Sequence, residues 1–98
     1  MGRTSGDNKH LEGLTSGRFA HVIASQSNFV VRATAGRLLR VILNTNGGTV
    51  TLKNGQSAVI GIIASDSPEG TFNYGVYCSN GIYVDTGATS DVTVVFSD

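Results

Sequence analysis

The sequence predicts an all-β protein, an antiparallel two-sheet sandwich of jelly-roll type with about eight short strands. Val, Ile and Thr together make up 27 of the 98 residues, and branching at Cβ favours extended strands over helices. From Phe19 onward, apolar and polar residues alternate with a period of two, and turn residues interrupt the alternation about every 8–12 positions. Thirteen Gly and a single Pro provide turns without breaking strand pairing.

Turn residues divide this region into its strands. Asn and Gly adopt positive φ at low cost, which predicts turns at 44–48, 54–55 and 80–81, and the longest loop is expected at 65–70. The strands are expected at residues 19–24, 28–34, 37–44, 49–53, 57–64, 71–77, 81–85 and 91–96.

Most of these strands have one apolar face, which is expected to lie against the core. The first strand leaves two alternatives, with either Ala20, Val22 and Ala24 or Phe19, His21 and Ile23 facing inward. In the other strands the expected inward residues are Phe29, Val31, Ala33, Leu39, Val41, Leu43, Val50, Leu52, Ala58, Ile60, Ile62, Phe72, Tyr74, Val76, Ile82, Val84, Val92, Val94 and Phe96. The opposite, solvent-facing sides of the strands are expected to contain Arg32, Arg40, Thr51, Lys53, Asn73, Asp85, Asp91 and Thr93.

The segment 58–64 is apolar on both faces. It is either a central strand covered by a loop, or an edge strand whose outer residues, Val59 and Ile63, contact another subunit. In the second case the protein is an obligate oligomer.

Residues 1–17 differ from the rest in composition, because they contain four Gly, four charged residues and few large apolar side chains. Such a segment buries too little apolar area to offset the entropy of ordering it. We therefore expect two parts, a flexible N-terminal arm at 1–17 and a β-sandwich domain at 18–98. The arm is either a frayed terminus or a segment that orders on a partner by docking Leu11 and Leu14.

Charge is distributed unevenly, although the net charge is zero. Residues 1–53 contain all seven Lys and Arg with two acidic residues, and residues 54–98 contain five acidic residues. This pattern predicts either ordinary cross-strand ion pairs or two poles that meet head-to-tail between subunits. The zero net charge and the scarcity of aromatic residues near the arginines argue against nucleic-acid binding.

The sequence contains no convincing catalytic or cofactor motif, which predicts a protein that is not an enzyme. Asp85-Thr86-Gly87 matches the aspartic-protease triplet, but only 11 residues follow Gly87, so we interpret it as a polar turn between strands. His21 is expected to be a strand residue with a hydrogen-bonded ring nitrogen, and Cys78 an inert small residue. Two His and one Cys at unrelated spacings do not form a metal site, and no apolar run is long enough for a membrane helix.

Three segments resemble small virion proteins of tailed bacteriophages. They are FVVRATAGRLLRVILN at 29–44, GTVTLKNG at 48–55 and GIYVDTGATSDVTVVF at 81–96, and the likeness covers roughly residues 28–96. In such proteins a strand leads to Ala-x-x-Gly-x-Leu, then to a strand that ends in Asn and a short hairpin. A closing Asp-Val-Thr-Val completes the pattern.

The resemblance implies a structural protein without a cofactor, a head-decoration or cement protein that stabilises the capsid as a homo-oligomer, often a trimer. Its partners would be the major capsid protein and other copies of itself, and it would reside on the virion surface after synthesis in the host cytoplasm. The expected shell contacts in the arm are Arg3, Lys9, Leu11 and Leu14. The alternatives are a tail, neck or fibre component, and a carbohydrate-binding module. Of the three tyrosines Tyr74, Tyr77 and Tyr83, the last two would face outward in such a module.

Overall fold

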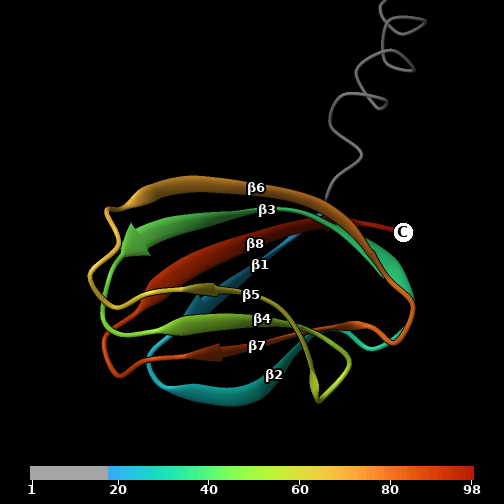
Figure 1. Cartoon of the computed structure of the whole chain (residues 1–98), viewed down its shortest axis with the longest axis horizontal. Coiled ribbons are helices and arrows are strands. Elements are labelled where there is room, and N and C mark those ends of the chain that lie inside the picture. Colours follow the sequence, from blue (N-terminus) through green and yellow to red (C-terminus); the bar gives the residue numbers. More distant parts are fainter. Residues whose placement is uncertain (1–17) are drawn as a thin grey trace, which may run out of the picture.

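The computed structural model describes residues 18–98, which form eight β-strands and no helix (Figure 1). Each strand begins and ends within two residues of the position expected from the sequence. The strands are β1 (Arg18–Ile23), β2 (Gln26–Arg32), β3 (Gly36–Thr45), β4 (Val50–Asn54), β5 (Ala58–Ile63), β6 (Gly70–Cys78), β7 (Ile82–Thr86) and β8 (Asp91–Ser97).

The strands form two antiparallel sheets of four. Sheet A has the order β1-β8-β3-β6 and sheet B the order β2-β7-β4-β5. Along the chain, the first strand pairs with the eighth, the second with the seventh, the third with the sixth and the fourth with the fifth. The chain is therefore one long hairpin rolled into a sandwich, which confirms the predicted jelly-roll topology.

Turns lie where Asn and Gly predict them. Gly55 has a φ of 76° in the β4–β5 turn and Gly81 a φ of 97° before β7, values that suit Gly because it has no Cβ. The loops after β3 and β7 use Gly for a different reason. A Cβ on Gly47 would lie 2.2 Å from the backbone of Thr89, so these two loops can touch only without a side chain there.

The core lies between the sheets and takes alternate side chains from both. For β1 the first alternative is confirmed at Val22, which is buried, whereas Phe19 and Ile23 are exposed. The expected inward residues Ala24 and Ala33 are exposed, because β1 and β2 end at the preceding residues. The buried apolar residues are Val22, Leu38, Val41, Leu43, Val50, Leu52, Ile63, Cys78, Ile82, Val84, Val92, Val94 and Phe96.

Two β-bulges change which side chains face the core. In β3 the pairing register shifts between Leu38 and Arg40, so Leu38 is fully buried, and the prediction that Leu39 faces inward is wrong. In β5 a register shift leaves one extra residue, and Ile63 is buried whereas Ile62 is exposed. Both assignments in β5 reverse the prediction, because one inserted residue inverts the alternation that follows it.

Candidate functional site

The large exposed apolar side chains of the described residues all lie on the edge strands. The edges of sheet A are β1 and β6, and the edges of sheet B are β2 and β5. One open side of the sandwich is formed by the consecutive strands β1 and β2, and the other by β5 and β6. The exposed residues are Phe19 and Ile23 on β1, Val30 on β2, Val59 and Ile62 on β5, and Tyr77 on β6. Each open side therefore presents three large apolar side chains.

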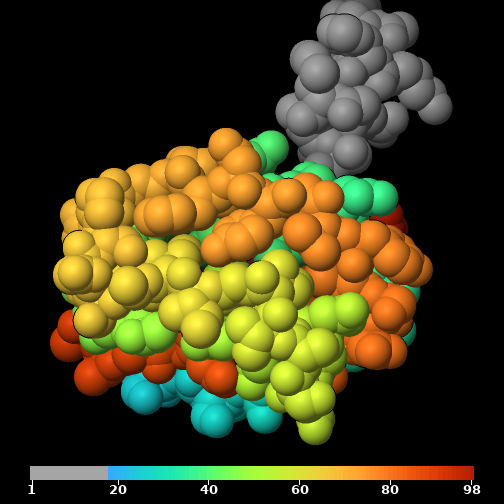
Figure 2. All heavy atoms as spheres, in the orientation of Figure 1, coloured from blue at the N-terminus to red at the C-terminus, as the bar shows by residue number. Residues whose placement is uncertain are grey.

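The β5/β6 side contains the segment that is apolar on both faces. Since β5 is an edge strand, the second of the two alternatives for this segment describes its position. Val59 is 56% exposed, as expected of a residue that contacts another subunit. Ile63 is buried in the core, so the prediction that it contacts another subunit is wrong. Because of the bulge, Ile62 lies on the outer face instead and is 62% exposed. Figure 2 shows this side, with atoms of β5 (yellow) and β6 (orange) together on the near face.

A polar cluster on the outer face of sheet B joins three strands. Lys53 Nζ on β4 lies 2.9 Å from Asp85 Oδ2 on β7 and also donates to Asn28 Oδ1 on β2. The backbone N–H of Asn28 donates to Asp85 Oδ1 at 2.6 Å. Asn28 has a φ of 52°, a left-handed conformation that Asn tolerates better than most residues. The prediction that Lys53 faces water is wrong: its side chain is only 9% exposed, because these partners hold the ammonium against the sheet.

Asp85 lies inside β7, which confirms its place in the expected strand 81–85. The interpretation of Asp85-Thr86-Gly87 as a turn is wrong for Asp85 and Thr86, because the strand continues through Thr86. Burial raises the pKa of the Asp85 carboxyl and is the largest single effect on it. The hydrogen bonds from the Asn28 N–H and from Lys53, with the charge of Lys53, together outweigh burial and hold this pKa below its usual range. The neighbouring Thr86 hydroxyl donates to the carbonyl of Ala24 at 2.6 Å and fastens the β1–β2 connection to β7.

A second polar cluster lies on the outer face of sheet A. Asp91 Oδ1 accepts a hydrogen bond from His21 Nε2 at 2.5 Å and another from Asn44 Nδ2 at 3.1 Å. These bonds, His21 first, hold the pKa of the Asp91 carboxyl below its usual range. The prediction that a ring nitrogen of His21 is hydrogen-bonded is confirmed.

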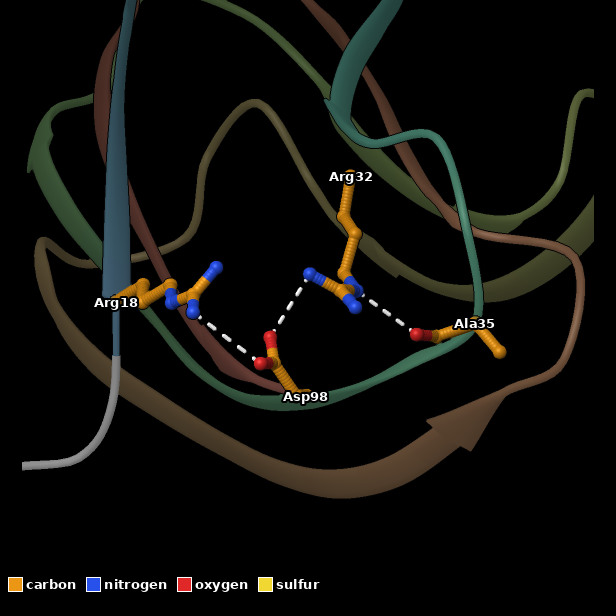
Figure 3. Close-up of polar contacts among 4 residues, drawn as sticks. All are labelled: Arg18, Arg32, Ala35 and Asp98. Atoms are coloured by element: carbon orange, nitrogen blue, oxygen red, sulfur yellow. Dashed lines mark hydrogen bonds and ion pairs between the residues drawn. The ribbon is translucent and has the colours of Figure 1, made fainter.

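A third cluster connects the two sheets at one end of the sandwich (Figure 3). The side chains of Arg18 on β1 and Arg32 on β2 point from opposite sides to the carboxylate of Asp98, which follows β8. Arg32 Nη1 lies 2.8 Å from Asp98 Oδ1, and Arg18 Nη2 lies 3.2 Å from Asp98 Oδ2. Arg32 Nε also donates to the carbonyl of Ala35 at 2.8 Å. Through Arg32 and Asp98, sheet B is bound to sheet A.

The ion pairs join the basic first half of the chain to the acidic second half. Among the described residues, every ion pair between Arg or Lys and Asp joins a base from 1–53 to an acid from 54–98. Strands from both halves alternate within each sheet, so opposite charges become neighbours inside one molecule. The structure thus shows ion pairs within one molecule, as the first alternative predicts. Contact of the two poles between subunits stays a prediction.

The remaining predictions concern Cys78, metal sites, membrane helices and the N-terminal arm. Cys78 is buried, and burial raises the pKa of its thiol, with partial opposition from a hydrogen bond with the Leu38 backbone. In residues 18–98 there is no surface pocket and no group of three metal-ligating side chains. The same part of the chain has no helix that is long and apolar enough to cross a membrane. The predicted arm contacts Arg3, Lys9, Leu11 and Leu14 lie outside the described residues.

Sequence reasoning missed the edge position of the β1 residues and the exposure of Ile62. The alternation in β1 offers two apolar faces, and only the position of this strand in the fold shows that Phe19 and Ile23 face solvent. Comparison with known proteins adds no further assignment, because no protein-family model, no curated protein and no solved structure matches this chain.

Proposed function

We propose that this chain is a structural protein of a bacteriophage virion, a decoration or cement protein that binds the head surface as an oligomer and stabilises it. The main support is the distribution of the exposed apolar side chains, three on each open side of a jelly roll. Exposed apolar groups at two separate places are expected of a protein that joins two neighbours. The partners in this proposal are the major capsid protein and further copies of the chain itself.

The position of the virion-like segments supports the same proposal. The segments 29–44, 48–55 and 81–96 include all of β4 and β7 and all but the last residue of β3 and of β8, which are the inner strands of the two sheets. The likeness therefore extends through the framework of the sandwich. The edge strands β1, β5 and β6 contribute no residue to these three segments, and they present most of the exposed apolar residues.

A repeated lattice allows weak contacts to give firm attachment. Each copy need bind its site only modestly, because an oligomer that contacts several sites at once gains effective concentration with every contact. An oligomer of small domains that bridges neighbouring capsomers would then oppose their separation when the shell is heated.

The test is binding of the purified full chain to empty heads of the phage that encodes it. We expect co-sedimentation with the heads and a higher melting temperature of the shell in calorimetry. The double variant Val59→Lys/Ile62→Lys is expected to reduce binding if the β5/β6 side contacts the shell. Asp66→Lys, on an exposed loop, makes the same change in net charge and serves as the control. Heads that neither retain the protein nor gain thermal stability contradict the proposal.

A carbohydrate-binding module is the second candidate, and Tyr77 is the observation that favours it. Its ring is 57% exposed on the edge strand β6 and pairs in register with Arg37 of β3. An exposed tyrosine ring is a surface on which a sugar can stack. Binding on a glycan array that Tyr77→Ala abolishes would favour this candidate over the virion proposal.

A further inference from the structure

The four edge strands differ in how regular they are, and β1 is the regular one. Its six residues pair with β8 in one unbroken register from Arg18 to Ile23. The register of β2 shifts twice, and β5 contains the bulge described above. In β6, Gly75 has a φ of 67°, next to the register shift opposite β3. Bulges and twists of this kind prevent an edge strand from pairing with another chain, and β1 has none.

The hydrogen bonds between β1 and β8 show which backbone groups of β1 face its open edge. The Ala24 N–H donates to the carbonyl of Ser90 at 3.0 Å, in continuation of the β1–β8 register. Since antiparallel partners alternate between bonded and non-bonded pairs, Ala20 and Val22 also direct their backbone groups to β8. The odd-numbered residues therefore direct their N–H and C=O groups to the open edge, and these residues are Phe19, His21 and Ile23.

One further contact supports the assignment of the odd-numbered residues to the open edge. The carbonyl of Ile23 accepts a hydrogen bond from the side-chain amide of Gln26 at 3.0 Å, and hence points away from β8. This bond is exposed, so a backbone donor can replace the Gln26 amide at little cost.

We propose that the β1 edge binds the β1 edge of a second copy of this chain in antiparallel register about a twofold axis at His21. The proposal deepens the proposed function and rests on it, because it names the surface through which copies associate. Bonding groups face the edge only at odd positions, so each bonded pair must join two odd residues. An axis at Ala20 or Val22 would bring only two of the three odd residues of β1 into bonded pairs. With His21 on the axis, Phe19 of each copy pairs with Ile23 of the other, and all three residues are used. The two sheets A then form one continuous sheet of eight strands.

The side chains and charges suit this register. Phe19 and Ile23, which are 70% and 53% exposed, lie on the same face and meet across the axis, one pair on each side of it. Arg18 faces Ala24 of the other copy, so no two arginines meet. The two His21 residues meet at the axis, and each is already hydrogen-bonded to the carboxylate of its own Asp91. The edge of a second copy therefore offers hydrogen-bonding partners for the open backbone groups and apolar contacts for Phe19 and Ile23, and it places no like charges opposite each other.

The test is sedimentation equilibrium of the full chain over a dilution series up to about 1 mM, so that even a dimer with a Kd of about 1 mM is detected. We expect a mass that rises with concentration from 10.2 kDa to twice that value. Phe19→Lys/Ile23→Lys should remain at the monomer mass throughout. Tyr77→Lys, on the opposite edge of sheet A with similar exposure, should dimerise like the unsubstituted chain.

Amide hydrogen exchange by NMR tests the register without any substitution. The amides of Phe19, His21 and Ile23 should exchange fast in dilute samples and become protected as the dimer forms. Those of Ala20 and Val22, bonded to β8, should be protected at every concentration. A monomer at all concentrations, a trimer as the only oligomer, or a dimer in which the three odd amides stay unprotected overturns the proposal. Because no heads are used, this failure is distinguishable from a failure to bind heads.

Discussion

Lys53 and Asp85 show how a polar pair on the outer face of a sheet becomes part of the packing. The ammonium of Lys53 is almost fully covered and has Asp85 and Asn28 as its partners. A buried ammonium without a counter-charge is costly, so each partner matters more than in an exposed ion pair. The Asp85 carboxylate is tied to β2 as well as to β4, and it connects three strands of sheet B.

Asp85→Asn is expected to lower the free energy of unfolding at pH 7 by about 1–3 kcal/mol, because it leaves Lys53 buried without a counter-charge. Chemical denaturation of the two proteins measures the difference. Asp66→Asn, on an exposed loop, should change stability by less than about 0.5 kcal/mol. Lys53→Met in the Asp85→Asn background should recover part of the loss, because it removes the unpaired ammonium.

The cost of Asp85→Asn should also depend on pH. The pKa of Asp85 is lower in the folded than in the unfolded chain, so its stabilisation is complete above the unfolded pKa of about 4. It is lost as the pH falls through the folded pKa. The stability difference between the two proteins should therefore shrink below about pH 4. A difference that stays constant down to pH 2 would mean that the charge of Asp85 is not its source.

At the scale of elements, the strands could be predicted from sequence, and so could the burial of Val41 and Leu43 in β3. The burial of Leu38 in place of Leu39, and the inward face of β5, could not. Alternation and Asn/Gly turns are local signals, and they place all eight strands within two residues. A bulge is set by the register against a neighbouring strand, which no local pattern records. The same limit explains the candidate site: the apolar character of β5 is visible in the sequence, but the exchange of Ile62 and Ile63 follows from its pairing with β4. The partners of Lys53 were missed for this reason too.

The bulge in β3 gives a matched pair of substitutions. Leu38→Ala should cost about 2–5 kcal/mol of stability, because it leaves a cavity at a fully buried position. Leu39→Ala, one residue on and half-buried, should cost clearly less. Thermal or urea unfolding measures both. Equal costs, or a larger cost at Leu39, would place the bulge elsewhere in β3.

At the scale of the whole molecule, the two sheets are joined by the shared core and also by the cluster around Asp98. Arg32 bridges from sheet B to a residue that follows the last strand of sheet A, and its side chain fills the space where a Cβ of Gly36 would lie. It therefore contributes packing, a carbonyl contact and an ion pair at once.

Arg32→Ala should lower the free energy of unfolding by about 1–2 kcal/mol, because packing, a hydrogen bond to the Ala35 carbonyl and an ion pair are lost together. Arg18→Ala removes a more exposed ion pair with the same Asp98 and should cost less than about 1 kcal/mol. Differential scanning calorimetry of the two variants compares them. A larger loss for Arg18→Ala would show that the ion pair to β1, and not the bridge between sheets, dominates this cluster.

The pairing of β1 with β8 has a consequence for how the chain acquires its structure. Among the strands of residues 18–98, β1 pairs with β8 alone, and the residues that meet there, such as His21 and Asp91, are 70 positions apart. During synthesis on the ribosome, β1 emerges before the other described strands and has no strand to join until β8 has been made. The β4–β5 hairpin, closed by a short turn, can form much earlier. We therefore expect the sandwich to close only after β8 has been synthesised, over milliseconds to seconds as for other folds dominated by distant pairings.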